Sequence, residues 1–138
     1  MARRIEFTKV YDHQIKDVWE ALTNSEALSE WLMPCDLKPI VGHKFQFKTK
    51  PYPGFNGIVD CEVLEVEHQR KLSFSWSGGT LKNTTVSFEL TELGNKTQLQ
   101  FVHSGFEGFF NKIIVSRILT NGWLNKILTV NLIKYLSK

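Results

Sequence analysis

The sequence has few of the features that identify a secreted, membrane-spanning or metal-binding protein. Its 138 residues include only two cysteines, Cys35 and Cys61, which form neither a CxxC pair nor a zinc-binding set. No apolar run reaches the roughly 18 residues that a membrane helix needs, because Lys126 and Lys134 interrupt the most apolar stretch. The N-terminal residues lack the apolar core of a signal peptide. We therefore expect a cytoplasmic protein with reduced thiols and no membrane insertion, with a Cys35–Cys61 disulfide as the alternative.

The sequence also lacks the patterns that bind nucleic acids, metals or nucleotides. A formal net charge of +3 is mild, and the one basic patch, Lys44, Lys48 and Lys50, is typical of a strand edge protected against aggregation. The four histidines are far apart, with no HxxxH or HExxH spacing. A GxSxG nucleophile motif and a phosphate-binding loop are missing as well. We expect no nucleic-acid partner, no metal and no cofactor.

What the sequence does contain is hydrophobic periodicity of two kinds. A period of two predicts strands, and a period near 3.6 predicts amphipathic helices. Strands are expected at residues 3–11, 44–48, 58–67, 71–76, 83–90 and 97–103. Helices are expected at residues 14–23, from residue 24 or 25 to Pro34, and from residue 109 or 112 to 136, with Gly122 as a weak point in the last.

The order of these segments predicts an α+β fold in a single domain. It comprises one strand, two short helices, a run of about five antiparallel strands and a long C-terminal helix, so the sheet has about six strands. A sheet with one apolar face must be covered, and only the C-terminal helix is long enough to cover it. Within residues 58–67 the apolar side chains change face after Val63, which indicates a bulge or a strong twist.

Aromatic residues dominate the inward faces of the predicted strands. Aromatic walls with few polar groups suit an apolar ligand, although the same side chains packed tightly would form an ordinary core. His103 ends one inward row, where it would contact a ligand or transfer a proton, or else be an edge residue with its hydrogen bonds satisfied. On the C-terminal helix, the apolar arc also contains Arg117, Thr120 and Asn131, and each needs a partner or solvent. Tyr135 is a further candidate to orient a ligand.

Three stretches resemble a known family over nearly the whole chain. VWEALTNSEALSEWLMP (residues 18–34) is similar to its early helix pair, and residues 63–76 and 84–106 are similar to its central strands. NGWLNKILTVNLIKYL is similar to its final helix, with Gly122-Trp123 at a recurring Gly-Trp position. The chain thus resembles the activator of Hsp90 ATPase homologue-like branch of the SRPBCC, or START-like, superfamily that includes the Bet v allergen type. One departure is His68, where the family commonly has proline, and it affects only a turn.

The resemblance implies a helix-grip fold over residues 1–138 with a cavity between the curved sheet and the long helix. Members bind hydrophobic or amphipathic small molecules, so we expect a monomer that binds an aromatic or lipid-like molecule without catalysis. The expected ligand contacts are Phe45, Phe47, Cys61, Phe74, Trp76, Phe88, Phe101, His103, Thr120, Trp123, Ile127 and Asn131. Two alternatives stay open: a co-chaperone-like domain that binds a chaperone partner, and a small cyclase or hydrolase that uses His103.

Overall fold

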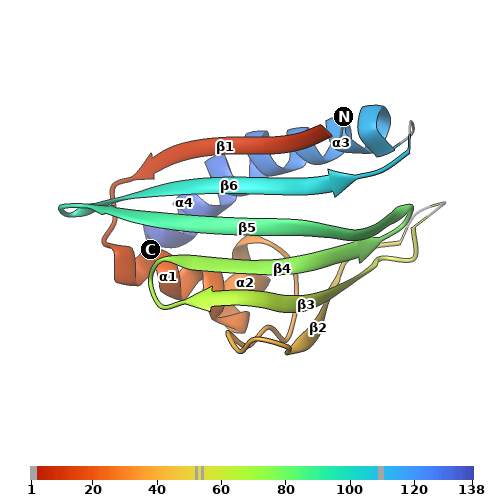
Figure 1. Ribbon diagram of the computed structural model, residues 1–138. Coiled ribbons are helices and arrows are strands. Elements are labelled where there is room, and N and C mark those ends of the chain that lie inside the picture. Colours follow the sequence, from red (N-terminus) through yellow and green to blue (C-terminus); the bar gives the residue numbers. More distant parts are fainter. Residues whose placement is uncertain (1–2, 52, 54, 109–110) are drawn as a thin grey trace.

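Six antiparallel strands form one sheet, and the helices lie on one of its faces (Figure 1). The computed structural model describes residues 3–51, 53, 55–108 and 111–138. The strand order across the sheet is β1-β6-β5-β4-β3-β2. The strands are β1 (Arg3–Tyr11), β2 (Lys44–Lys48), β3 (Ile58–Glu67), β4 (Lys71–Gly78), β5 (Leu81–Leu93) and β6 (Lys96–Phe106). The predicted α+β fold is confirmed, and β4, β5 and β6 extend beyond the predicted segments.

Two short helices follow β1, and a long helix ends the chain. The short helices are α1 (Ile15–Thr23) and α2 (Ser25–Trp31). Asn24 caps α2, because its side-chain oxygen accepts a hydrogen bond from the Ala27 N–H at 3.0 Å. The long helix consists of four consecutive segments: η1 (Asn111–Val115), α3 (Ser116–Thr120), η2 (Asn121–Asn131) and α4 (Leu132–Leu136). No helix in the described ranges is long and apolar enough to cross a membrane.

The core lies between the sheet and these helices. The inward aromatic residues of the strands are all buried, as predicted: Phe45, Phe47, Phe74, Trp76, Phe88 and Phe101. The C-terminal helix covers them with Trp123, Leu128 and Leu132, each at most 1% exposed. The apolar C-terminal segment therefore closes the core of its own domain.

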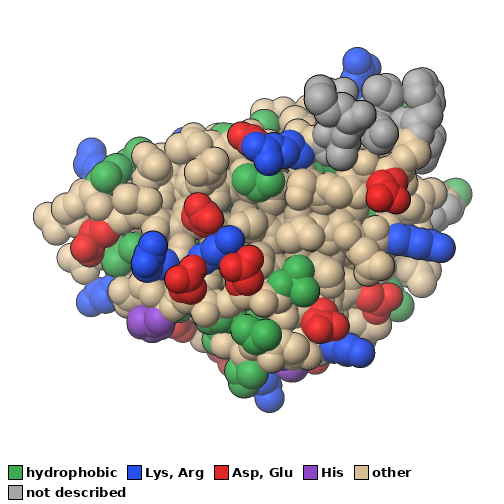
Figure 2. Space-filling model, in the orientation of Figure 1, with side chains coloured by type: hydrophobic (Ala, Val, Ile, Leu, Met, Phe, Trp, Pro, Cys, Tyr) green, Lys and Arg blue, Asp and Glu red, His purple; other side chains and the backbone are tan. Residues whose placement is uncertain are grey.

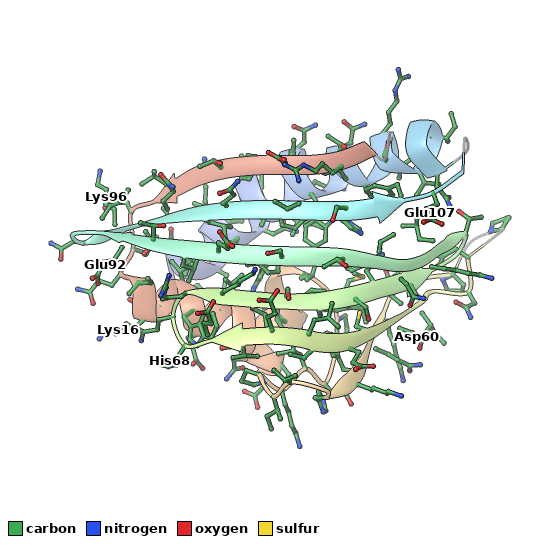
Figure 3. The ribbon with its side chains drawn as sticks, in the orientation of Figure 1. Lys16, Asp60, His68, Glu92, Lys96 and Glu107 are labelled. Atoms are coloured by element: carbon green, nitrogen blue, oxygen red, sulfur yellow. The ribbon has the colours of Figure 1, made fainter. Side chains whose placement is uncertain are left out.

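The opposite face of the sheet is a mixed polar surface. Lys and Arg side chains are interspersed with Asp and Glu over it (Figure 2). Lys71, for example, lies 3.2 Å from a Glu65 carboxylate oxygen and 3.5 Å from that of Glu89. Charged side chains also mark the two ends of the sheet, with Glu92 beside the β5–β6 turn and Asp60 at the other end (Figure 3). An interspersed pattern of this kind is typical of a solvated strand face rather than of a charged binding surface.

Strand β3 contains the irregularity that its change of face predicts. The pairing of β3 with β4 shifts between Val63 and Glu65, which leaves Leu64 exposed on the outer face. An extra residue in one strand bends and twists the sheet locally. The sheet can therefore curve toward the helix that covers it.

Hydrogen bonding in the C-terminal helix changes from α-type to wider π-type turns at Asn121. The helix therefore does not stop at the predicted weak point, Gly122. Near the end of η2, the Leu132 N–H donates to the Ile127 carbonyl instead of the Leu128 carbonyl that an α-helix would use. The Leu128 carbonyl accepts a buried hydrogen bond of 2.8 Å from the Tyr11 hydroxyl of β1. This bond ties the helix to the edge of the sheet.

We expect Tyr11→Phe to lower the free energy of unfolding by about 1–3 kcal/mol, because the buried hydrogen bond to the Leu128 carbonyl is lost. Denaturant unfolding of the variant and the wild type measures the difference. Tyr135→Phe, in the same helix region but half-buried, is the matched control and should change stability by less than about 0.5 kcal/mol. An equally small loss for Tyr11→Phe would contradict the prediction and show that the turn relaxes to α-helical hydrogen bonding.

Candidate functional site: the aromatic interior beneath the C-terminal helix

Six ring side chains meet between the sheet and the C-terminal helix and form what we call the interior cluster. Its members are Trp76, Phe88, Phe101, His103, Phe106 and Trp123, each at most 6% exposed. Trp123 is its centre, since its ring centroid lies 4.5 Å from that of Phe101 and 5.6 Å from that of Trp76. Such separations are typical of favourable aromatic pairs. The structure thus brings together five of the twelve expected ligand contacts, while Phe47 and Phe74 continue the same aromatic row toward β2.

His103 is fully buried and lies against three rings of the cluster. Its ring centroid is 4.8 Å from that of Phe106, 5.5 Å from that of Trp76 and 6.4 Å from that of Trp123. Burial lowers the pKa of His103 to about 3, because the charged imidazolium would lose its hydration. His103 is therefore a neutral imidazole at physiological pH, placed inside the core rather than at an exposed strand edge.

The structure adds Thr84 to this site, a residue that was not expected there. The His103 Nε2 atom lies 2.9 Å from the Thr84 hydroxyl, which in turn donates to the Trp76 carbonyl at 2.7 Å. Thr84 is 1% exposed. Val86 and Phe88 are alternate residues that both point inward. Thr84 lies two positions before Val86, so the same alternation would have placed it on the inward face as well.

Gly105 gives β6, just before Phe106, a backbone conformation that residues with a side chain rarely adopt. Its φ angle is +93°, and a Cβ atom there would lie 3.4 Å from the Thr84 Cα. The pairing of β1 with β6 shifts between Arg3 and Ile5, which lie opposite Phe106 and His103. This irregularity breaks the alternation after His103, so Phe106 joins the cluster although strict alternation would point it outward.

Two polar atoms in the cluster are buried without a hydrogen-bond partner in the part of the chain that the structure describes. They are His103 Nδ1 and Trp123 Nε1. The contrast with Trp31 is clear, because its indole N–H donates to the Ala21 carbonyl at 2.8 Å. A buried polar group left unpaired costs free energy, and native structures contain few of them. These atoms are therefore the polar groups of the interior that a bound molecule would satisfy.

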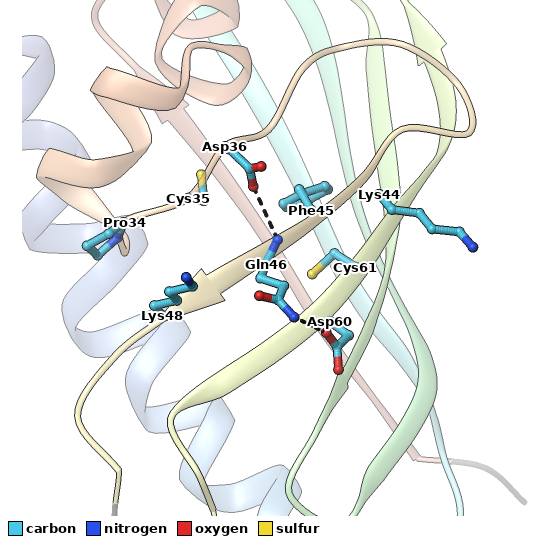
Figure 4. A pocket seen from close by; sticks show the side chains of 9 residues that line it. All are labelled: Pro34, Cys35, Asp36, Lys44, Phe45, Gln46, Lys48, Asp60 and Cys61. Carbon is cyan, nitrogen blue, oxygen red and sulfur yellow. Dashed lines mark hydrogen bonds between the residues drawn. The ribbon is translucent and has the colours of Figure 1, made fainter.

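A groove opens on the surface beside β2 (Figure 4). This groove of about 840 Å³ is lined by Pro34, Cys35, Asp36, Lys44, Phe45, Gln46, Lys48, Asp60 and Cys61. Gln46 links its two sides, since its backbone N–H donates to Asp36 at 3.4 Å and its side-chain amide donates to Asp60 at 2.7 Å. Two expected ligand contacts, Phe45 and Cys61, thus border the groove rather than the interior cluster.

The two cysteines are free thiols near this groove. Burial raises the pKa of the Cys61 thiol, and it also raises that of Cys35. Both side chains therefore stay protonated at neutral pH, which makes them poor nucleophiles. Among the described residues, no three His, Cys, Asp or Glu side chains gather to hold a metal ion.

The remaining expected contacts, Thr120, Ile127 and Asn131, lie along the C-terminal helix. Thr120 is half-buried, and its hydroxyl donates to the Ser116 carbonyl one turn earlier at 2.7 Å. Ile127 is half-buried and packs against the core. Asn131 lines a small groove of about 200 Å³ with Glu30, Lys134, Tyr135 and Lys138. The structure therefore distributes the expected contacts over the interior, the β2 groove and the far end of the helix.

Comparison with known proteins agrees with this architecture. A solved structure from Mesorhizobium loti is 29% identical, with a TM-score of 0.79 and coverage of 97% of this chain and 93% of that chain. A Bacillus halodurans protein is also 29% identical, with a TM-score of 0.78 and coverage of 99% of both chains. The Aha1 dimer from Colwellia psychrerythraea has the same fold at 18% identity, with a TM-score of 0.75 and coverage of 93% and 92%. The chain has no match among curated protein sequences.

The sequence itself places the chain in a family. The family model described as activator of Hsp90 ATPase homolog 1-like protein matches residues 12–129. That range includes both short helices, strands β2 to β6 and most of the C-terminal helix. The chain therefore belongs to the activator of Hsp90 ATPase homologue 1-like family, a branch of the SRPBCC proteins with a helix-grip fold.

Proposed function

We propose that this protein binds a hydrophobic or amphipathic small molecule, aromatic or lipid-like, between the sheet and the C-terminal helix. The observation that carries the proposal is the pair of buried, unpaired polar atoms, His103 Nδ1 and Trp123 Nε1, within an otherwise aromatic interior. Ligand pockets combine apolar walls with a few placed polar groups in this way. Burial of apolar surface, at about 25 cal/mol per Å², would supply the affinity, and the two polar atoms would orient the ligand.

Binding at this position requires Trp123 to shift, since its side chain is 1% exposed and contacts the rings of Phe101 and Trp76. The helix that carries Trp123 is suited to such a shift. Trp123 lies in η2, and π-type turns are rare and frequently occur at functional sites. Gly122 next to it has nothing within 4 Å of the position where a Cβ would lie. No described residue therefore packs against this position of the helix, which supports a shift there.

The site favours binding over acid–base catalysis. A general base works best when its pKa is near the operating pH. The pKa of His103 is lowered to about 3, so the neutral ring is a weak base. His103 is thus better suited to orient a ligand by hydrogen bonding than to remove a proton from it.

A chaperone partner is the second candidate, and the family itself favours it. The family is described by its likeness to an activator of Hsp90 ATPase, and a Plasmodium falciparum protein of the same fold is described as an HSP90 activator. Purified Hsp90 with and without this protein provides the test, because a co-chaperone role requires a rise in ATPase rate. Analytical ultracentrifugation of the same sample tests the expected monomer against the dimer described for the Colwellia relative.

We expect saturable chemical-shift changes when the isotope-labelled protein is titrated with flavonoids, sterols and fatty acids. Changes concentrated on Phe88, Phe101 and Trp123 would support the interior site. Changes concentrated on Gln46 and Asp60 would move the site to the β2 groove and contradict the proposal. No change with any compound class would leave the interior as an ordinary packed core and overturn small-molecule binding there.

A further inference from the structure

The hydrogen bonds around Thr84 determine which nitrogen of His103 carries the proton. A backbone carbonyl only accepts hydrogen bonds, so the single hydroxyl hydrogen of Thr84 is donated to the Trp76 carbonyl at 2.7 Å. The Thr84 oxygen can then only accept from His103 Nε2, which lies 2.9 Å away. Nε2 therefore carries the hydrogen in the neutral ring, and Nδ1 is left as a bare acceptor.

The two unpaired atoms of the cluster thus have opposite hydrogen-bonding roles. His103 Nδ1 needs a donor, whereas the indole Nε1–H of Trp123 can only donate and needs an acceptor. Their rings lie nearly edge to face, at 84°, with centroids 6.4 Å apart. The two atoms therefore belong to neighbouring rings, and a single group that enters between them as Trp123 shifts would have to donate to His103 Nδ1 and accept from Trp123 Nε1.

We propose that the ligand of this interior site is a phenol whose hydroxyl donates to His103 Nδ1 and accepts from Trp123 Nε1. The inference rests on the proposed function. A ketone or an ether only accepts and would leave Nδ1 unpaired. A carboxylate only accepts hydrogen bonds, and it would place its negative charge beside the Nδ1 lone pair. An ammonium group only donates hydrogen bonds, so it would leave the Trp123 N–H unpaired. A neutral hydroxyl satisfies both atoms at once.

The aromatic surroundings favour an aryl body over an alkyl one. Phe101 and Phe106 lie next to the two polar atoms, with ring centroids 4.5 Å from that of Trp123 and 4.8 Å from that of His103. Aromatic rings gain from offset or edge-to-face contact with another ring beyond the area that they bury. A phenol presents such a ring directly attached to the bridging hydroxyl.

A matched series of naphthalenes tests the inference: 2-naphthol, 2-methoxynaphthalene, 2-naphthoate and naphthalene. We expect 2-naphthol to bind about tenfold or more tightly than the methoxy compound, because only the hydroxyl pairs both buried atoms. Nitrogen-detected NMR of the histidine side chains supplies a second readout. It should show the Nε2–H tautomer of His103 in the free protein and a shift of Nδ1 when 2-naphthol binds.

Two variants separate the polar pairing from general apolar binding. Thr84→Val removes the acceptor that holds the tautomer and should reduce the preference for 2-naphthol to near one. Trp123→Phe removes a donor that the hydroxyl and the methoxy oxygen can both use, so it should weaken both compounds and keep the preference. Thr84 acts here as a positioning residue. Its neighbour Thr85 is the matched control, since it is half-buried and lies on the other face of β5. Thr85→Val should leave the preference at its wild-type value.

The outcomes distinguish the inference from the function on which it rests. Equal affinities for all four compounds would support binding at the interior site but contradict a phenol as its ligand. This result is expected if a trapped water already bridges the two polar atoms. An Nδ1–H tautomer in the free protein would also contradict the phenol. No binding of any compound, naphthalene included, would overturn both the phenol and the interior site.

Discussion

Trp123→Ala is expected to lower the free energy of unfolding by about 3–5 kcal/mol. The Trp123 side chain is 1% exposed and lies within aromatic contact of Trp76, Phe88 and Phe101. Its removal leaves a large void between the sheet and the helix that the surrounding rings can fill only in part. Chemical denaturation, followed by the fluorescence of the remaining tryptophans, measures the loss.

The same variant shows whether the interior can hold a small aromatic molecule. A dry apolar void readily accepts an aromatic guest of matching size, so indole should raise the melting temperature of Trp123→Ala by more than that of the wild type, in which Trp123 itself fills the position. Ile118→Ala is the control, because Ile118 lies on the same helix but is 58% exposed and should cost less than about 0.5 kcal/mol. A loss for Trp123→Ala as small as that of Ile118→Ala would contradict the assignment of Trp123 as the centre of the core.

Acidification is expected to destabilise the protein through His103 well above the pH at which carboxylates titrate. Burial lowers the pKa of His103 to about 3 in the folded protein, compared with about 6.5 in an unfolded chain. Between these values the unfolded chain binds a proton that the folded protein does not. Stability is therefore complete above about pH 6.5 and declines as the pH falls toward 3. Between pH 7.5 and pH 5 the His103 contribution amounts to about 2 kcal/mol.

Denaturant unfolding at pH 7.5, 6 and 5 measures this decline, and two variants assign it. His103→Gln removes the titrating group and should reduce the loss between pH 7.5 and 5 by about 2 kcal/mol. His68→Gln changes an exposed histidine and should leave the loss at its wild-type value. If His103→Gln retains the full pH dependence, then His103 is not a buried neutral imidazole, and the orienting role proposed for it fails as well.

Much of the fold could be predicted from the order of apolar residues alone. The alternation of Phe45 with Phe47 and of Phe74 with Trp76 predicts strands with one aromatic face, and the structure buries all four side chains there. The change of face after Val63 predicts the bulge that shifts the β3–β4 pairing. These predictions succeed because a strand can bury only alternate residues, so the pattern of the sequence and the pattern of burial have the same period.

The composition of the candidate site was predictable only in part. His103 and Trp123 were expected inside, but Thr84 and Phe106 were not, and Phe45 with Cys61 proved to border a separate surface groove. Thr84 reaches His103 because β5 pairs with β6 in one particular register, and Phe106 turns inward because the strand is irregular near Gly105. Register and irregularities depend on contacts between distant segments, which the local pattern does not contain.

The sequence by itself determined the element order, the aromatic face of the sheet and the membership of the chain in its family. Each of these depends on local periodicity or on residues in a fixed order. The tertiary structure alone decided which nitrogen of His103 is bare, because that follows from a hydrogen-bond chain through Thr84 to the Trp76 carbonyl. It also decided that, among the described residues, the Trp123 N–H has no hydrogen-bond partner while that of Trp31 has one. Hydrogen bonds extend over only about 3 Å, so they are defined by where the folded chain brings donors and acceptors and not by their spacing in the sequence.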